Sequence, residues 1–335
     1  MRKTIYTIGA FMAALLAAAS CTAPQAEVLP NWNNSPLKAE IIDFVENKTQ
    51  EIPVEDRIAV FDMDGTIACE QPLWFEMDVA VQKLVDKQEA DPSLRDITEY
   101  QYAVKLARDP RDTSVLNNWF AGGHNYLESM LLMAPDGIES EDYTAYAQDF
   151  LNTHTVWNGM KYNELFYQPM LELIDYLKAN QYEVYIVSGS TQNVVWSICP
   201  QEIGFDRHHL IGSRLESDVK FEKGKPATFV LHDSFTKPRN NYYSKSVNIF
   251  NQIGKIPVIA VGNTVGDFGL FHLAASSKYP SLVLMLNHDD AERELAYPPY
   301  YSGEEVYQWA DSLATYGWKK ANMSEEFKTV WKIRK

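Results

Sequence analysis

The chain has 335 residues, a formal net charge of −15 at pH 7 and an isoelectric point near 4.9. Hydrophobic residues make up 46% of it and aromatic residues 13%, which is enough to bury the core of one large domain or two ordinary ones. Proteins that bind nucleic acids usually carry a basic face, so this acidic composition disfavours a nucleic-acid polymer as a partner.

The N-terminus has the pattern of an export signal. A basic start, Met1-Arg2-Lys3, precedes an apolar run from Ile5 to Ala19. The run is too short for a comfortable membrane span and is typical of a secretory signal. We therefore expect residues 1–20 to be a cleaved signal peptide.

The residues that end this run, Ala18-Ala19-Ser20-Cys21, resemble a bacterial lipoprotein processing site. The resemblance implies cleavage before Cys21 and lipid attachment to its thiol. The protein would then be exported and held on a bacterial membrane by that anchor alone, on the periplasmic or the cell-surface face. An ordinary signal peptide followed by an incidental cysteine is the alternative. Residues 21–40 are expected to act as a tether, because Thr22 to Pro36 is polar and contains Pro and Asn.

Only two cysteines follow Cys21, namely Cys69 and Cys199. A disulfide framework is therefore not indicated, even in an exported protein. One Cys69–Cys199 bridge is possible, but we expect two buried, unpaired thiols. The oligomeric state stays open.

Short apolar runs predict the strands of a parallel sheet that is buried on both faces. They are Ile58–Phe61, Val184–Val187, Pro257–Val261 and Leu282–Leu286. Amphipathic segments at Met170–Ala179 and Ser246–Ile253 predict helices, the second closed by Gly254. The alternation of strand and helix favours a Rossmann-like three-layer α/β/α core built from residues 41–68 and 167–335.

The stretch between the first two strands shows little strand signal. Helical patterns cover much of it, at Leu73–Lys87, Thr98–Arg108, Ser114–Phe120 and Glu141–Leu151. The stretch is too long for one crossover and predicts an inserted, mostly helical cap domain over residues 69–166. Such an insertion is expected to lie over the sheet edge as a lid.

Two aspartates follow the first predicted strand directly. Asp62 and Asp64 come after an apolar run and precede Gly65 and Thr66. Two carboxylates one residue apart at the end of a buried strand repel each other, so the pair indicates a bound cation and a chemical role rather than a solvated turn. We expect Asp62 to attack phosphorus, and Asp64 to act as general acid on the leaving oxygen and later as general base on water. Thr66 is expected to order the loop and to contact phosphate.

Phosphate donors and a lysine are expected at the same edge. The Ser188 hydroxyl and the N–H groups after it, starting at Gly189, can donate to a phosphoryl oxygen, although Ser-Gly-Ser is also a common helix cap. Lys245 begins a helical pattern shortly before the third strand, so it is the preferred lysine. Its rivals lie in polar, proline-containing sequence: Lys223, Lys225 and Lys237.

Asn263 and Asp267 follow the third predicted strand. The carboxyl ends of parallel strands meet at one edge of a sheet, which brings this loop to the two aspartates. Mg²⁺ prefers hard oxygen ligands. A carboxylate oxygen of Asp62, the backbone carbonyl of Asp64 and this loop are therefore the expected ligands of Mg²⁺.

Taken together, these segments resemble the haloacid dehalogenase-like superfamily, within its phosphatases. Phe61–Thr66 matches the DxDGT signature of that superfamily, Ser188 its second motif, Lys245 its third, and Asn263 with Asp267 its fourth. The resemblance implies a Mg²⁺-dependent phosphomonoester hydrolase that works through an aspartyl-phosphate on a small phosphorylated metabolite.

Finer resemblances and departures refine this expectation. The helical insertion and Leu210–Glu216 resemble the phosphoserine phosphatase-like branch, and Leu286–Glu294 resembles uncharacterised exported or bacterial hydrolases of the superfamily. Asn263 stands where many members have Asp, which lowers the expected Mg²⁺ affinity or shifts coordination to Asp267. Asp64 is kept, unlike in the dehalogenases, which favours phosphate esters over carbon–halogen bonds.

The substrate is open between three classes: nucleotides, phosphorylated amino acids or amino alcohols, and small phosphomonoesters in general. The resemblance implies substrate contact by an acidic residue near Glu70, which precedes Gln71 at the start of the insertion. The insertion is also rich in rings, namely Trp74, Phe75, Trp119, Phe120, His124, Tyr126 and Trp157. Most are expected to pack the helical core, but any that line a pocket can stack on a ring or, with Glu70, enclose a choline-like cation.

Three other functions are compatible with parts of the sequence. A lipid-anchored protein that binds a phosphate ligand with little or no turnover gains support from Asn263. A phosphotransferase or phosphomutase would keep Asp64, but export disfavours it. A membrane-tethered scaffold comes last, since it would need no acidic pair.

Overall fold

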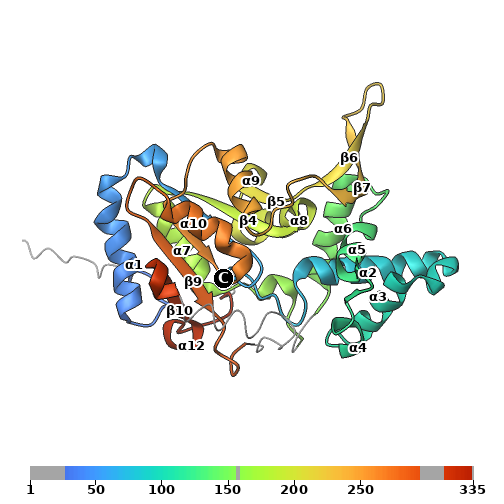
Figure 1. The fold of residues 1–335 in the computed structure, drawn as a ribbon, viewed down its shortest axis with the longest axis horizontal. Coiled ribbons are helices and arrows are strands. Elements are labelled where there is room, and N and C mark those ends of the chain that lie inside the picture. The colour runs from blue at the N-terminus through green and yellow to red at the C-terminus, as the bar shows by residue number, and fades with distance from the viewer. Residues whose placement is uncertain (1–26, 156–158, 295–312, 334–335) are drawn as a thin grey trace, which may run out of the picture.

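The computed structural model describes residues 27–155, 159–294 and 313–333. Its centre is a six-stranded sheet in the order β10-β9-β8-β1-β4-β5, in which neighbouring strands run parallel (Figure 1). In chain order the strands are β1 (Ile58–Phe61), β4 (Glu183–Thr191), β5 (Leu210–Ser213), β8 (Ile259–Gly262), β9 (Leu282–Asn287) and β10 (Lys319–Asn322).

Helices cover both faces of this sheet. Alternate side chains of a strand point to opposite faces, and β1 shows the consequence. Ala59 and Phe61 join a core with α1, α7 and α8, whereas Ile58 and Val60 join a second core with α9 and α10. The helices are α1 (Pro36–Glu46), α7 (Gln168–Ala179), α8 (Gln192–Ile203), α9 (Ser244–Ile253), α10 (Phe268–Ala275) and the short α12 (Met323–Glu326). The predicted three-layer α/β/α core with a parallel sheet is confirmed.

Strands β5 and β10 were not predicted, and β4 is longer than predicted. Backbone pairing continues past Val187, because Thr191 still pairs with Ser213 of β5. β10 has the sequence Lys-Lys-Ala-Asn, which lacks any apolar run. It forms an edge strand, where lysines are common because one side faces solvent.

The long stretch after β1 folds into helices, most of which share a separate apolar cluster that includes Met77, Leu84, Leu106 and Met130. Buried side chains of the last of these helices, such as Tyr143, instead join the core that contains Phe61. The helices are α2 (Phe75–Ala90), α3 (Thr98–Arg108), α4 (Thr113–Leu116), α5 (Tyr126–Met133) and α6 (Ser140–Thr153). We call this helical body the cap; it lies at one end of the molecule (Figure 1).

The predicted helix Ser114–Phe120 is wrong beyond Leu116. There the chain turns into two short strands, β2 (Phe120–Ala121) and β3 (His124–Asn125), which pair as a hairpin. Gly122 and Gly123 both have positive φ, at 61° and 82°, which interrupts the helical pattern. Asn125 then caps α5, a helix that the sequence analysis did not predict.

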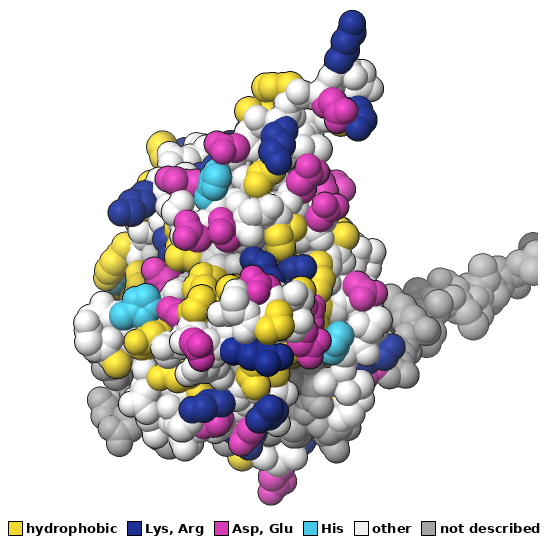
Figure 2. Space-filling model, turned by 90° about the vertical axis from the view of Figure 1, so that its right-hand side faces the viewer, with side chains coloured by type: hydrophobic (Ala, Val, Ile, Leu, Met, Phe, Trp, Pro, Cys, Tyr) yellow, Lys and Arg dark blue, Asp and Glu magenta, His cyan; other side chains and the backbone are white. Residues whose placement is uncertain are grey.

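Part of the chain assigned to the core domain also joins the cap. Strands β6 (Leu215–Lys220) and β7 (Thr228–Phe235) form an antiparallel hairpin. Leu231 of β7 accepts a hydrogen bond from the Gly137 N–H and donates one to the Ile138 carbonyl, each at 2.9 Å. The hairpin projects away from the rest of the molecule, with basic side chains at its end (Figure 2). The cap is therefore not made from residues 69–166 alone.

The tether prediction is wrong from residue 27 onward. Trp32 is 1% exposed, and its indole N–H donates to the Pro169 carbonyl at 2.8 Å. Leu29 and Leu37 are also buried, and Ser35 caps α1. The few apolar side chains in this polar segment form no periodic pattern, and Trp32 finds its partner in the distant helix α7. The signal peptide, Cys21 and residues 21–26 lie outside the described residues.

Both remaining cysteines, Cys69 and Cys199, are free and buried, as predicted. Within the three described ranges, no helix has the length and apolar character that crossing a bilayer requires.

Candidate active site

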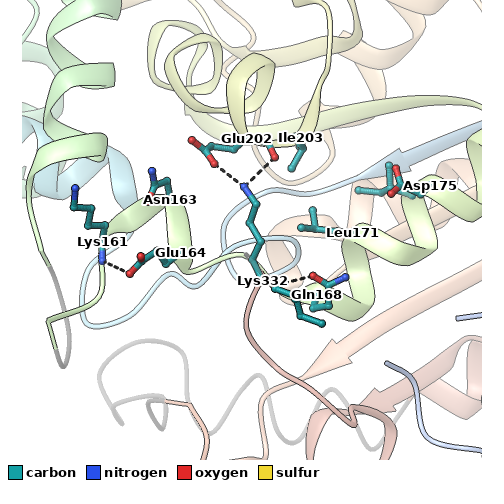
Figure 3. A pocket seen from close by; sticks show the side chains of 11 residues that line it. Lys161, Asn163, Glu164, Gln168, Leu171, Asp175, Glu202, Ile203 and Lys332 are labelled. Carbon is teal, nitrogen blue, oxygen red and sulfur yellow. Dashed lines mark hydrogen bonds and ion pairs between the residues drawn. The ribbon is translucent and has the colours of Figure 1, made fainter. Parts of the chain in front are cut away.

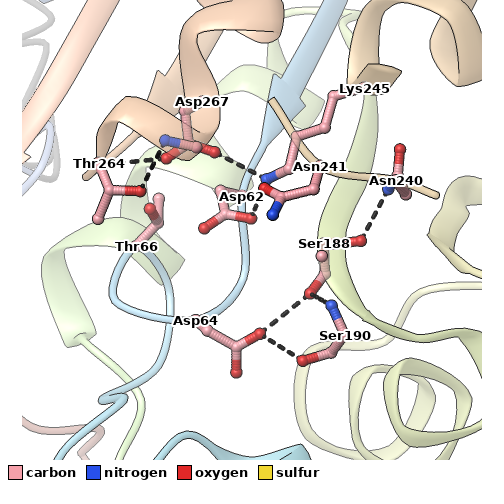
Figure 4. Close-up of polar contacts among 12 residues, drawn as sticks. Asp62, Asp64, Thr66, Ser188, Ser190, Asn240, Asn241, Lys245, Thr264 and Asp267 are labelled. Carbon is pink, nitrogen blue, oxygen red and sulfur yellow. Dashed lines mark hydrogen bonds and ion pairs between the residues drawn. The ribbon is translucent and has the colours of Figure 1, made fainter. Parts of the chain in front are cut away.

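The site lies where three neighbouring strands end. Phe61, the last residue of β1, pairs with Ile186 of β4 on one side and Val261 of β8 on the other. Asp62 comes next and donates its backbone N–H to Val261 at 2.9 Å. The carboxyl ends of β8, β1 and β4 thus deliver polar residues to one edge, as the sequence predicted (Figure 4).

Lys245 holds the centre of this edge. Its Nζ lies 2.6 Å from Oδ1 of Asp62 and 2.7 Å from Oδ1 of Asp267. All three side chains are buried. Burial, with the nearby charges of Asp267 and Asp64, raises the pKa of Asp62 well above its ordinary value, while Lys245 acts in the opposite direction. Burial alone would lower the pKa of Lys245, but the two carboxylates outweigh it and raise that pKa.

The rival lysines do not take this position. Lys223, Lys225 and Lys237 are all exposed. Lys245 reaches the acids because it lies on the first turn of α9, whose packing against α10 requires a glycine. A Cβ at Gly269 would lie 2.3 Å from the carbonyl oxygen of Tyr242, directly before α9.

Asp64 occupies a different environment from Asp62. Its Oδ2 accepts hydrogen bonds from the hydroxyls of Ser188 at 3.0 Å and Ser190 at 2.8 Å. Its Oδ1 is buried without any hydrogen-bond partner. Burial raises the pKa of Asp64, and the two serine bonds oppose that shift. Ser188, predicted as a phosphate donor, thus has its hydroxyl directed at Asp64, and Ser190 was missed.

The loop after β1 is held by polar contacts to the loop after β8. Thr66 donates to Oδ1 of Asn263 at 3.2 Å, and Nδ2 of Asn263 donates to Oε1 of Glu70 at 2.8 Å. Gly65 has φ +74°, and a Cβ there would meet Asn263 at 2.0 Å, so this position requires glycine. Thr66 is fully buried. It orders the loop as predicted, but it is not placed to touch a phosphate in the cavity.

Asp267 has a structural task of its own. Its Oδ2 accepts the backbone N–H groups of Asn263 at 3.0 Å and Thr264 at 3.1 Å. This carboxylate therefore closes the turn after β8 while its other oxygen pairs with Lys245. Of the four predicted metal ligands, Asp267 and Asn263 are both engaged within the loop network.

These residues surround a cavity of about 280 Å³. Its lining includes Asp62, Asp64, Glu70, Gly189 and Lys245. A larger hollow of about 710 Å³ lies elsewhere, beside Lys332 and Glu202, and contains none of the predicted site residues (Figure 3). In this hollow, Nζ of Lys332 lies 2.6 Å from Oε2 of Glu202, so the two charges already pair with each other. Cavity volume therefore does not identify the active site.

The acidic cavity has the donor set that a divalent cation prefers. Its lining includes the carboxylates of Asp62, Asp64 and Asp267, which are all hard oxygen donors, whereas Asn263 is not a lining residue. The unpartnered Oδ1 of Asp64 is a buried acceptor in need of a cation or donor. Among the described residues, only one group of three His, Cys, Asp or Glu side chains has its potential ligand atoms within 4.8 Å of one another. It consists of Asp206, His208 and His209, outside the acidic cavity. In the acidic cavity, Lys245 lies between Asp62 and Asp267 and forms an ion pair with each.

Sequence reasoning missed a buried pair behind the loop. His288 follows β9; its Nε2 lies 2.6 Å from the Gly65 carbonyl and its Nδ1 lies 2.7 Å from Oε2 of Glu294. Tyr167 donates its hydroxyl to the other oxygen of Glu294. Burial alone would lower the pKa of His288, but Glu294, and then Glu70 and the Gly65 carbonyl, raise it overall. A histidine directly after an apolar strand was the signal available in the sequence.

Two more residues at the cavity were not foreseen. Glu76 of α2 is buried and accepts the Thr191 N–H at 2.8 Å, which links the cap to the end of β4. Burial raises its pKa, and Arg239 counteracts that shift. Arg239 pairs with Glu128 of α5 at 2.7 Å. Glu76 lies among apolar residues and Arg239 lies in a polar segment, and neither shows a pattern in the sequence that indicates its partner.

Comparison with known families places the chain. The family model for haloacid dehalogenase-like hydrolases matches residues 59–272. The chain therefore belongs to this family of hydrolases. No curated protein gives a significant match.

One solved structure supports the fold. A conserved, functionally unknown protein from Anaerococcus prevotii DSM 20548 matches with a TM-score of 0.51 at 17% identity, over 84% of this chain and 91% of that chain. A protein of unknown function from Bordetella pertussis Tohama I gives 0.48 at 13% identity, over 79% and 97%. A phosphoserine phosphohydrolase-like protein from Francisella tularensis subsp. tularensis SCHU S4 gives 0.39 at 11% identity, over 77% and 98%. The last two scores are too low to support an argument.

Replacing Lys245 with Met is expected to lower the free energy of unfolding by about 3–5 kcal/mol in chelator at pH 8, because Asp62 and Asp267 would stay buried without a countercharge. The loss should be smaller at pH 5. Without the lysine, the pKa of Asp62 rises further, so the variant loses stability as pH rises. Urea denaturation at the two pH values measures this. Lys255→Met, which breaks a partly exposed pair with Asp56, is the control and should cost less than about 1 kcal/mol. Equal losses in both variants would show that Asp62 and Asp267 do not need Lys245 as a countercharge.

Glu294→Gln is expected to lower the free energy of unfolding by about 3 kcal/mol at pH 6, because a buried charged partner is lost. The folded-state pKa of His288 is raised, so the stabilisation is complete below the unfolded-state pKa of about 6.5 and is lost as pH rises through the folded-state pKa. The difference between wild type and variant should therefore shrink at pH 9. Denaturant titrations at both pH values test it, with the exposed neighbour Glu292→Gln as control. A difference that grows with pH would rule out a charged His288–Glu294 pair.

Proposed function

We propose that this hydrolase is a Mg²⁺-dependent phosphomonoesterase that works through an aspartyl-phosphate. The observation that carries the proposal is the contrast between the two aspartates. Asp62 is paired with Lys245, whereas Asp64 is held by two serine hydroxyls and has a raised pKa. Two acids in different environments suit a nucleophile and a general acid.

In the first step, an oxygen of Asp62 attacks phosphorus and the bond from phosphorus to the alcohol oxygen breaks. Asp64 gives its proton to that leaving oxygen, which the raised pKa of Asp64 favours. In the second step, Asp64 takes a proton from water as the water attacks phosphorus. The bond to Asp62 breaks, and phosphate is released. Ser188 and Ser190 orient the Asp64 carboxyl for both proton transfers.

Asp62, the backbone carbonyl of Asp64, and the loop of Asn263 and Asp267 would hold Mg²⁺. When bound, the ion would offset the negative charge of the acids and of the phosphoryl group. Lys245 supplies positive charge next to Asp62. The amide oxygen of Asn263 accepts a hydrogen bond from Thr66 and is the kind of neutral oxygen ligand that Mg²⁺ accepts.

The rival with support is a phosphate-binding protein with little turnover. Asn263 is neutral and is tied to Thr66 and Glu70, which weakens the expected metal site. The intact set of Asp62, Asp64 and Lys245 favours the enzyme. The placement in the phosphoserine phosphatase-like branch stays a prediction.

The test is phosphate release from an aryl phosphate by the soluble domain, with Mg²⁺ and with chelator. Wild type should turn over only with the cation, and Asp62→Asn should lower kcat by roughly 10³-fold or more, as expected for a nucleophile. Asp233→Asn, an exposed aspartate, is the matched control and should behave as wild type. Turnover that survives Asp62→Asn would overturn the mechanism. No turnover, together with phosphate binding in both proteins, would favour the binding protein.

We also propose that the protein is exported and anchored through a lipid on Cys21. Because Glu27 already pairs with Lys38 of α1, only residues 22–26 would separate the anchor from the folded domain, a reach of at most about 18 Å. The domain would then lie close to the membrane surface. Mass spectrometry of the mature N-terminus should find Cys21 carrying acyl chains, and Cys21→Ser should abolish that mass. An unmodified N-terminus at another residue would refute the anchor.

A further inference from the structure

We propose that the site takes phosphomonoesters whose alcohol carries a flat, largely apolar ring, and that this ring lies in an apolar cavity between the cap and the core. The inference rests on the phosphatase function proposed above and names its substrate class. Five observations support it.

The apolar cavity adjoins the catalytic one. Its volume is about 320 Å³, beside about 280 Å³ for the catalytic cavity. Trp74, Arg239 and Tyr242 line both. A phosphoryl group at Asp62 therefore leaves its alcohol facing the apolar cavity across these three residues.

The lining of the two cavities differs in chemistry. Acids dominate the catalytic cavity. The apolar cavity is lined by leucines of the cap, such as Leu116, Leu127 and Leu131, together with Trp74 and Trp119. Ligand pockets of this size usually combine an apolar lining with a few polar groups that set orientation. Aromatic walls favour a planar ring, which they contact over a large area.

Charge in the apolar cavity is already neutralised. Its charged lining residues are Arg239 and Glu128, which pair with each other at 2.7 Å. A phosphorylated amino acid would bring an ammonium and a carboxylate, and each would have to break this pair to find a partner. A ring without charge leaves the pair intact.

Arg239 nevertheless offers one polar contact. Its guanidinium stacks on Phe235, with 4.3 Å to the ring centre, and its Nε is buried without an acceptor. An unpaired buried donor costs free energy that a ligand acceptor recovers. A ring that bears an oxygen or nitrogen acceptor near the phosphate would satisfy it.

Backbone strain marks the junction of the cavities. Tyr242 has φ +47°, which is uncommon for a residue other than glycine. Its carbonyl accepts the Lys245 N–H at 3.1 Å and is confined by Gly269. Its side chain is 53% exposed. The contacts that place Lys245 thus also place a half-exposed aromatic ring at the mouth of the apolar cavity, as strained residues often do at binding sites.

The experiment compares 2-naphthylmethyl phosphate with ethyl phosphate in the presence of Mg²⁺. Both esters release a primary alcohol, so their intrinsic reactivity is similar and the ratio of the two kcat/KM values reports binding of the ring. We expect wild type to favour the naphthylmethyl ester by about 30-fold or more, a range that apolar pockets achieve. Trp119→Ala should lower that ratio about tenfold, and Leu127→Asn should lower it as well. Both residues are partly exposed, but Leu127 also packs against the apolar cluster of the cap, so Trp119→Ala is the decisive variant.

Phe229→Ala, an exposed aromatic residue of the hairpin outside the cavity, is the matched control and should keep the wild-type ratio. A wild-type ratio near one, or a ratio that Trp119→Ala leaves unchanged, would overturn the inference while the phosphatase function stands. If wild type turns over neither ester, the phosphatase function fails by itself. Calorimetry with 2-naphthylmethylphosphonate and ethylphosphonate then decides the pocket: tighter binding of the ring compound that Trp119→Ala weakens supports it, and equal binding refutes it.

Discussion

The buried ammonium of Lys245 between Asp62 and Asp267 is the constraint on which the site depends. A charge that is this far from water is stable only when its partners are in place. Three chain segments must therefore meet: the end of β1, the start of α9 and the turn after β8. That meeting depends on the close approach of α9 and α10 at Gly269, where no side chain fits. The packing of two helices on the sheet thereby decides the electrostatics of its edge.

The loop of Asp62 and Asp64 is supported from two further sides. Asn263 and Glu70 hold it on one side, and His288 holds the carbonyl of Gly65 on the other. Because Gly65 has a positive φ, its carbonyl points where a typical loop carbonyl would not, and His288 meets it there. The Asp64 carboxyl can then keep its bonds to two serines of β4. Support from several sides holds a functional side chain in one geometry.

The cap and the core meet through a small number of polar links. Glu76 reaches the end of β4, Arg239 reaches α5, and the β6–β7 hairpin adds backbone hydrogen bonds to the cap. These links enclose an acidic cavity and an apolar one next to each other. The same arrangement separates two surfaces: the core edge carries the acids and Lys245, and the cap side carries leucines and tryptophans.

The sequence by itself determined the parallel sheet, the helical insertion and most of the acidic edge, because buried strands need apolar runs and the motif residues follow those runs directly. It also singled out Lys245 among four lysines. Only the tertiary structure decided that Thr66 is buried, that Ser190 joins Ser188 on Asp64, that His288 and Glu294 support the loop, and that residues 27–40 pack against the core. It also decided the fate of polar segments such as β10 and the β6–β7 hairpin. The physical reason is common to all of these: each depends on a partner distant in the chain, and neither a buried polar pair nor a polar edge strand has a periodic pattern that reveals its partner.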